Sequence, residues 1–226
     1  MVLKKTLFTG GSGTLGKEIV ALEPELLHPT SKELDITSSE SVSAYFEQND
    51  LELVIHAAAF TNVPLAETEA LRAMEVNVVG TYNLLAECMK RKIKFVFVST
   101  DYVFDGEKGD YTTEDPINPL TNYAKSKAAA ELMVRMYDNS LTVRTSFFPK
   151  MFPYDKATID QWTTKDYVDL IAPKILSSCL SDEKGVIHCG HKKRTIFHIA
   201  KVRRPDVKIV KREDLGHKIP KDTSLC

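Results

Sequence analysis

A tyrosine and a lysine four positions apart, Tyr123 and Lys127, are the residues of this chain best suited to chemistry. On a helix, side chains at this spacing lie on the same face. An ammonium beside a phenol favours the phenolate and brings the pKa of the tyrosine toward the range of a general acid or base. The pair therefore predicts proton transfer, although the same spacing is also found on ordinary exposed helix faces.

A glycine-rich segment far upstream supports a catalytic interpretation of this pair. Gly11, Gly13 and Gly16 follow the apolar residues 6–8 and precede a helical pattern at residues 15–22. Between a strand and a helix, this spacing is typical of dinucleotide binding, because it permits a tight turn and close approach of the pyrophosphate to a helix N-terminus. A turn without a ligand is the less favoured alternative. We predict dinucleotide contacts from Gly10, Ser12, Gly13, Thr14, Leu15 and Gly16.

The residues after a second predicted strand, at residues 25–28, bear on the choice of dinucleotide. NAD-binding proteins carry an acid at the end of this strand. Here Ser31 and Lys32 follow instead, and they suit a 2′-phosphate better than a free hydroxyl pair. We therefore predict NADP(H), with NAD(H) possible, since a single lysine here can also be a plain surface residue. Asp35 and Ile36 are expected at the adenine edge.

Hydroxyl groups are expected close to the tyrosine. Ser99 and Thr100 end a buried apolar strand, and ligands of parallel sheets bind at the carboxyl ends of the strands. Thr100, Tyr123 and Lys127 would together form a set of residues that handles a proton.

The elements that must position these residues alternate along the chain. Apolar strand patterns occur at residues 6–8, 53–58, 93–99 and 141–144, and helical patterns at 15–22, 39–48, 70–90 and 120–137. Apolar strands separated by helices indicate a parallel sheet covered on both faces. Weaker patterns follow: a helix at 164–178, a strand at 185–188, a helix at 196–202 and a strand at 207–210.

The fold expected from this order is α/β, with a doubly wound parallel sheet of the Rossmann type. Residues 1–148 are predicted to form the dinucleotide-binding core with the Tyr/Lys helix. Residues 149–226 are predicted to form a short C-terminal part, which completes the sheet and provides a small, shortened substrate lobe.

Composition excludes several classes of function. The 226 residues carry a formal net charge of -1, which argues against nucleic-acid binding through bulk charge. No apolar run reaches the roughly 20 residues that span a membrane. The four cysteines form no C-x-x-C pair, and the first residues show no signal-peptide pattern, so a cytoplasmic protein with reduced thiols is expected. His188, His191 and His198 lack the carboxylate or cysteine pattern of a metal site, and we predict no metal.

These motifs together resemble the extended short-chain dehydrogenase/reductases. The resemblance rests on residues 9–16, 57–59, 99–106, Asn77 and the Tyr/Lys pair. Within that family, residues 99–106 and 116–131 are similar to the dTDP-4-dehydrorhamnose reductases of dTDP-rhamnose biosynthesis, and the similarity is strong to residue 148 and patchy afterwards. The resemblance implies an oxidoreductase that uses NADP(H) to reduce the C4 keto group of a nucleotide-linked 4-keto-6-deoxy sugar.

The resemblance also implies residue roles. Tyr123 would give a proton to the C4 oxygen, Lys127 would hold the nicotinamide ribose and lower the pKa of Tyr123, and Thr100 would orient the carbonyl. Further cofactor contacts would come from Ala57, Ala58, Ala59, Asn77 and Ser99. Substrate contacts would come from Thr61, Val63, Tyr102 and Phe147, of which Val63 and Phe147 can equally be packing residues. A homodimer through a four-helix contact of residues 70–90 and 120–137 is also expected.

The chain departs from the family pattern on the substrate side. The segment between Arg144 and Trp162 is short, Phe147 replaces a tryptophan, and His56 replaces an asparagine. Some similar reductases bind magnesium at a dimer contact, but only Glu18 matches that acidic set. Two alternatives to the reductase therefore stay open. One is a nucleotide-sugar epimerase or dehydratase, which retains its cofactor through the cycle. The other is a non-catalytic regulatory subunit, similar to that of methionine adenosyltransferase.

Overall fold

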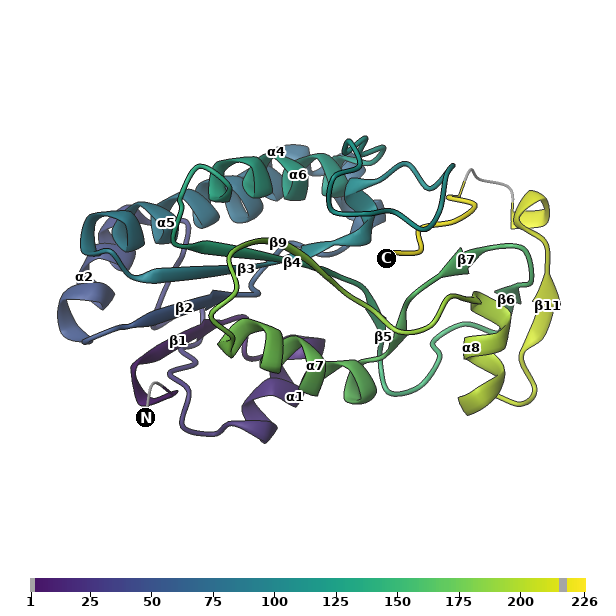
Figure 1. Ribbon diagram of the computed structural model, residues 1–226, viewed down its shortest axis with the longest axis horizontal. Coiled ribbons are helices and arrows are strands. Elements are labelled where there is room, and N and C mark those ends of the chain that lie inside the picture. Colours follow the sequence, from purple (N-terminus) through teal and green to yellow (C-terminus); the bar gives the residue numbers. More distant parts are fainter. Residues whose placement is uncertain (1–2, 216–218) are drawn as a thin grey trace.

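A parallel sheet of five strands forms the centre of the molecule, in the order β1-β2-β3-β4-β9 (Figure 1). The computed structural model describes residues 3–215 and 219–226. All four strand pairs in this sheet are parallel, which confirms the predicted doubly wound α/β fold. The strands are β1 (Thr6–Thr9), β2 (Leu53–His56), β3 (Lys94–Thr100), β4 (Ser140–Thr145) and β9 (Gly185–Cys189).

Helices cover both faces of the sheet, so each face has its own apolar core (Figure 1). One face packs against α1 (Thr14–Leu22) and α7 (Val168–Leu180), and the other against α2 (Ser39–Gln48), α5 (Gly80–Arg91) and α6 (Asn122–Val134). Successive strand residues alternate between the cores, as the pleat requires: Val96 and Val98 belong to the first, and Phe95 and Phe97 to the second.

The predicted second strand is shorter than expected. Only Leu27 bridges to β1, where its amide donates to the carbonyl of Thr6 at 3.0 Å and its carbonyl accepts from Phe8 at 2.8 Å. Pro24 and Pro29 flank this segment and lack the amide that a longer ladder needs, which accounts for the single bridge. The chain nevertheless returns to the edge of the sheet beside the glycine turn.

The long helix predicted at residues 70–90 is interrupted by a π-helical segment, η2 (Glu75–Val79), between α4 (Ala70–Met74) and α5. A π turn holds more residues than an α turn, so residues before and after it no longer share one face. Met74 is accordingly exposed and Leu85 buried. The buried Asn77 lies within this segment.

The C-terminal part contributes β9 and α7 to the central fold and otherwise builds a small lobe. The predicted start of α7 at residue 164 was wrong, because β8 (Asp166–Tyr167) pairs there with β5 (Phe147–Phe148). A separate cluster around Phe152, Tyr167 and Ile199 holds the lobe together. Its other elements are β6 (Lys156–Thr158), β7 (Trp162–Thr163), β10 (Arg194–Thr195), α8 (Ile196–Arg203) and β11 (Lys208–Val210).

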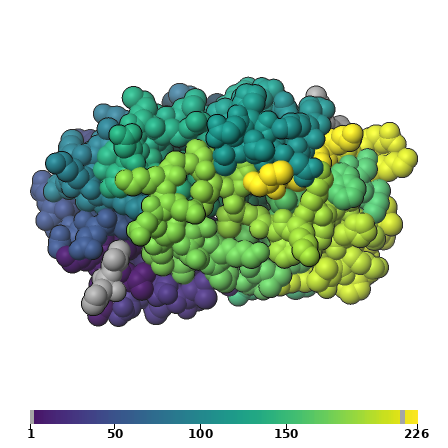
Figure 2. Space-filling model, viewed as in Figure 1, coloured from purple at the N-terminus to yellow at the C-terminus, as the bar shows by residue number. Residues whose placement is uncertain are grey.

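The last residues of the chain lie between the lobe and the loop that follows β3. Figure 2 shows this segment in yellow, between the teal loop and the green C-terminal part. Short helical elements complete the structure: η1 (Leu3–Lys5), α3 (Val63–Thr68), η3 (Asp101–Val103) and η4 (Arg212–Leu215). Across residues 3–215 and 219–226, no helix has the length and apolar character needed to cross a membrane.

Candidate active site

The glycine turn joins β1 to α1 with little space for side chains. Gly10 has φ +87°, and a Cβ there would lie 2.7 Å from the amide nitrogen of Ala58. A Cβ on Gly16 would lie 2.1 Å from the carbonyl oxygen of Gly10. Gly13 precedes α1 without a side-chain cap, so no side chain occupies the N-terminus of this helix. This arrangement fits a dinucleotide pyrophosphate, which first-turn amides can bind.

The turn that follows the Leu27 bridge lies against the glycine turn. A Cβ placed on Gly11 would approach the Cβ of His28 to 3.2 Å. Ser31 and Lys32 follow a few residues later and are both exposed. Within the described ranges, the Lys32 ammonium forms no ion pair. A cation and a hydroxyl beside the dinucleotide turn are suited to a 2′-phosphate.

The acids near this turn already accept hydrogen bonds from neighbouring threonines. The carboxylate of Glu33 accepts hydrogen bonds from the amide and hydroxyl of Thr30, at 2.7 and 2.9 Å. Asp35 accepts in the same way from Thr37, at 2.9 and 2.7 Å. One oxygen of each carboxylate is thus occupied by a threonine, which leaves one oxygen of each acid for other donors. Ile36 is half-buried beside α5.

The segment after β2 forms the next wall of the predicted cofactor cleft. Residues 57–59 are half-buried, and their backbone is held by Thr9, which accepts from the amides of Ala57 and Ala58. His56 is fully buried between the hydroxyls of Thr9 and Thr81, at 2.7 and 3.0 Å. Burial lowers the pKa of His56 to about 3, so its imidazole is neutral and serves as a structural bridge.

Asn77 connects this wall to the helix that carries Tyr123 and Lys127. Its side-chain oxygen accepts from the amide of Phe60 at 2.7 Å. Its side-chain nitrogen donates to the carbonyl of Phe60 and to the hydroxyl of Ser126, at 3.2 and 2.9 Å. Asn77, predicted as a cofactor contact, therefore positions the residue 57–60 segment relative to α6.

Ser99 and Thr100 at the end of β3 point to different surroundings. The Ser99 hydroxyl donates to Glu131 at 2.8 Å inside the core, where Glu131 also forms a fully buried ion pair with Arg144 at 2.6 Å. Thr100 instead donates to Asp101 at 3.2 Å and lies beside Tyr123, where its hydroxyl acts to lower the pKa of the phenol. The sequence placed both hydroxyls in the site, and the structure brings only that of Thr100 to the tyrosine.

Tyr123 is surrounded by residues from three parts of the chain. Its ring packs edge-on against Tyr102, with 6.3 Å between ring centroids. Burial raises the pKa of Tyr123 above its ordinary value, while the Thr100 hydrogen bond and the charge of Lys165 act in the opposite direction. The sequence predicted a lowered pKa through Lys127, so the direction found for the chain alone is the reverse.

Lys127 lies one helical turn below the tyrosine and is almost fully buried. Its ammonium donates to the carbonyl of Val98 at 2.8 Å and lies 3.9 Å from the ring centroid of Phe97. Burial lowers the pKa of Lys127 to about 7. Its charge therefore depends on pH near neutrality, and an anionic neighbour would favour the ammonium.

The predicted substrate residues are only partly gathered at the site. Tyr102 contacts Tyr123, whereas Phe147 is half-buried against the core on the α1 side of the sheet. Thr61 is exposed and Val63 half-buried, at the start of α3. Lys165, which sequence reasoning missed, donates to the Tyr102 hydroxyl at 3.2 Å. Its segment was expected to be helical, and no motif marks it.

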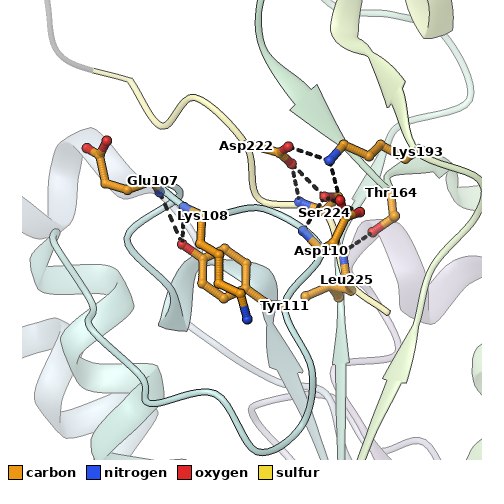
Figure 3. A network of polar contacts seen from close by, with 9 residues as sticks. All are labelled: Glu107, Lys108, Asp110, Tyr111, Thr164, Lys193, Asp222, Ser224 and Leu225. Atoms are coloured by element: carbon orange, nitrogen blue, oxygen red, sulfur yellow. Dashed lines mark hydrogen bonds and ion pairs between the residues drawn. The ribbon is translucent and has the colours of Figure 1, made fainter.

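The C-terminal segment braces the loop that carries Tyr102. Thr223 donates to Asp101 at 2.9 Å, and Asp222 pairs with Lys193 at 2.6 Å and accepts from the hydroxyl of Ser224 at 2.6 Å. Figure 3 shows the contacts of Asp222 with Lys193 and Ser224, and Lys193 there also reaches Asp110. Lys193 thus binds two carboxylates of the protein.

A metal site finds no support in the ranges that the structure covers. There, no group of three or more His, Cys, Asp or Glu side chains is placed to hold an ion. Glu18, the one acid that matched a family metal set, pairs with Lys150 at 2.9 Å.

Comparison with family models places residues 4–151 in the family described as the RmlD substrate binding domain. A dTDP-4-dehydrorhamnose reductase from Aggregatibacter actinomycetemcomitans is 38% identical over 152 residues, which are 64% of this chain and 52% of that protein. A dTDP-4-keto-6-deoxy-D-glucose reductase from Streptomyces niveus is 32% identical over 204 residues, covering 80% and 71%. The chain spans about half the length of the first of these relatives.

Solved structures extend the likeness to nearly the whole chain. A dTDP-4-dehydrorhamnose reductase from Clostridium acetobutylicum superposes with a TM-score of 0.87 at 28% identity, covering 98% of this chain and 89% of that one. A reductase of the same name from Bacillus anthracis, solved in complex with NADP, superposes with a TM-score of 0.86 at 25% identity and the same coverage. The similarity in fold therefore continues beyond residue 151.

Proposed function

The chain belongs to the RmlD substrate binding domain family, and on that premise we propose that it is an NADP(H)-dependent reductase of a nucleotide-linked 4-keto-6-deoxy sugar. The observation that carries the proposal is the position of Tyr123 beside Thr100 and Tyr102, which lie at and just after the carboxyl end of β3. The glycine turn lies at the same edge of the sheet, after β1. A proton donor and a dinucleotide site on one sheet edge are what carbonyl reduction requires.

The chemistry divides between the cofactor and the chain. NADPH, when bound, would supply the hydride to C4 of the sugar. Tyr123 would give its phenolic proton to the C4 oxygen as negative charge develops there. Thr100 would orient the carbonyl through its hydroxyl, and Lys127 would contact the nicotinamide ribose. The buried setting of these groups keeps water from competing for the same hydrogen bonds.

Support for NADP(H) over NAD(H) comes from the turn beside the glycines. Ser31 and Lys32 are exposed there, and the nearby acids Glu33 and Asp35 are engaged with threonines. The Bacillus anthracis relative was solved with NADP. We expect tighter binding of NADPH than of NADH, and a Lys32→Glu variant should reduce this preference. Equal affinities in the unmodified protein would contradict the choice.

A dehydratase would need a free acid next to the catalytic threonine. Asp101 is the acid in this position, but its two oxygens accept from Thr100 and Thr223, at 3.2 and 2.9 Å. Tyr102 stands where that chemistry expects a glutamate. These contacts favour a reductase, which consumes NADPH, over a dehydratase, which would regenerate it.

The decisive assay uses the purified full chain with NADPH and a panel of dTDP, UDP and GDP 4-keto-6-deoxy sugars. We expect stoichiometric oxidation of NADPH and formation of the 4-hydroxy sugar with a dTDP substrate. Binding of NADPH without oxidation by any member of the panel would contradict the reductase and favour a regulatory subunit. Turnover of sugar without net NADPH consumption would favour an epimerase or dehydratase.

Association and cellular location complete the proposal. α4 and α6 are neighbours, and both expose apolar side chains, among them Leu71 and Leu132. Such a face supports a homodimer through a four-helix contact. All four cysteines are free thiols, as expected for a protein of the reducing cytoplasm.

A further inference from the structure

One cation of the C-terminal part lies against Tyr102, the aromatic neighbour of the proposed proton donor, and the mechanism above does not use it. Lys165 stands in the short connection between β7 and β8, two strands that pair with β10 and β5. We propose that Lys165 is a positioning residue, which stabilises the Tyr123 phenolate formed during reduction and acts together with Tyr102. This inference rests on the proposed function, because it assigns Tyr123 as the proton donor.

The position of the ammonium is defined by aromatic neighbours. The Lys165 Nζ donates to the Tyr102 hydroxyl at 3.2 Å and lies 4.4 Å from the centroid of that ring. The centroid of Phe148 is 5.8 Å away. Tyr102 in turn packs edge-on against Tyr123. The cation is therefore one aromatic ring away from the phenol, and Lys165, Tyr102 and Tyr123 are each half-buried, which limits the water that screens the charge.

In the described chain, no carboxylate forms an ion pair with Lys165. No carboxylate oxygen among those residues lies within 4.0 Å of its ammonium. Asp101 is the acid near both Lys165 and Tyr123, and its oxygens are occupied by Thr100 and Thr223. Burial alone would lower the pKa of Lys165, but Tyr102, Asp101 and Tyr123 outweigh it and keep the group an ammonium.

The proposed step gives this charge a function. As hydride adds to C4, the electron pair of the carbonyl moves to its oxygen, which takes the proton of Tyr123. The O–H bond of Tyr123 breaks and its electron pair stays on the phenolate, while Lys165 keeps all its protons. A fixed cation one aromatic ring away from the phenol favours the charged form, and so makes Tyr123 a stronger acid. Water reprotonates the phenolate after release of the product.

Two substitutions separate this role from substrate binding and from packing. Lys165→Met removes the charge and keeps the length of the side chain, whereas Lys165→Arg keeps the charge. In Lys165→Met, we expect kcat near neutral pH to fall about tenfold or more, and the alkaline limb of the kcat profile to move up by about one pH unit. Lys165→Arg should retain most of the activity. A raised KM with an unmoved profile would overturn the proposal.

A direct titration keeps the test independent of turnover. With tyrosine labelled at Cζ, NMR reports ionisation of Tyr123, whose signal is assigned by its loss in Tyr123→Phe. At a fixed alkaline pH at which all variants are folded, we expect a smaller ionised fraction in Lys165→Met than in the unmodified chain and Lys165→Arg. Equal fractions would overturn the proposal. Failure of the whole sugar panel would instead count against the reductase, because this titration needs no substrate.

Discussion

At the scale of single residues, burial determines the protonation of the site. Tyr123 and Lys127 both lie in surroundings that disfavour charge, so burial raises the pKa of the phenol and lowers that of the amine to about 7. A neutral phenol is the form that can donate a proton to a carbonyl oxygen. The chain alone thus holds Tyr123 in the state needed at the start of a reduction.

The rate of the proposed reaction should therefore depend strongly on the phenolic proton of Tyr123. Tyr123→Phe should reduce kcat by about 10²–10⁴-fold, since that is the usual contribution of a general acid. NADPH affinity should change little. Tyr137→Phe is the matched control, because Tyr137 lies beyond the far end of α6 and donates to the carbonyl of Ile93 at 3.1 Å. Similar losses in both variants, in steady-state assays, would contradict the role of Tyr123.

Lys127 predicts a pH dependence of stability with a definite sign. Its pKa rises from about 7 in the folded chain to the ordinary value of 10.5 on unfolding. Between these values the unfolded chain binds a proton that the folded chain lacks, so the free energy of unfolding rises with pH, by at most ~1.4 kcal/mol per pH unit. Below pH 7 the cost of burying the charge is fully present. Lys127→Met should remove this slope in urea titrations at about pH 7 and about pH 9. Equal slopes in the unmodified chain and in the Lys127→Met variant would contradict this prediction.

At the scale of elements, close contacts between backbone atoms hold the glycine turn in place. A Cβ on Gly16 would meet the carbonyl oxygen of Gly10 at 2.1 Å, and one on Gly13 would meet the same oxygen at 3.2 Å. Backbone atoms move less readily than side chains, so a Cβ on Gly16 would force α1 away from the glycine turn. The glycine spacing is thus a requirement of packing as well as of ligand binding.

Gly16→Ala and Gly13→Ala form a graded pair that tests this requirement. Gly16→Ala should destabilise the fold by roughly 1–3 kcal/mol, as overpacking does, and abolish measurable NADPH binding. Gly13→Ala should cost less, because a shift of a few tenths of an ångström relieves its contact. Thermal unfolding and calorimetric titration with NADPH measure both effects. A Gly13→Ala variant less stable than Gly16→Ala would contradict the order.

Sequence reasoning reached the elements that have strong local patterns. The central strands and most helices were predicted because long apolar runs and 3.6-residue spacing are local signals. The π turn at residues 75–79 was missed, since it changes the face of Leu85 without changing the sequence pattern. Lys165 was missed for a similar reason: short strands of two residues, paired with distant segments, bring it to Tyr102. Such positions depend on tertiary contacts.

At the scale of the whole molecule, the proposed catalytic set draws on both parts of the chain. Thr100 and Tyr123 belong to the core, whereas Lys165 and Thr223 reach the same site from the C-terminal part. The C-terminal part therefore contributes residues to the proposed site. This dependence also explains why the last residues are bonded to the loop after β3, where Thr223 donates to Asp101.

The exposed apolar face of α4 and α6 leads to a prediction about association. Leu71 is 70% exposed and Leu132 is 52% exposed, on two helices that contact each other. Apolar side chains gathered on neighbouring helices favour burial against a second copy. Leu71→Glu combined with Leu132→Glu should convert a dimer to a monomer in sedimentation velocity, because charges would be buried unpaired. Met151→Glu, at a 60% exposed position of the lobe, should leave the dimer intact. A monomeric unmodified chain, or a dimer that survives both charges, would contradict this interface.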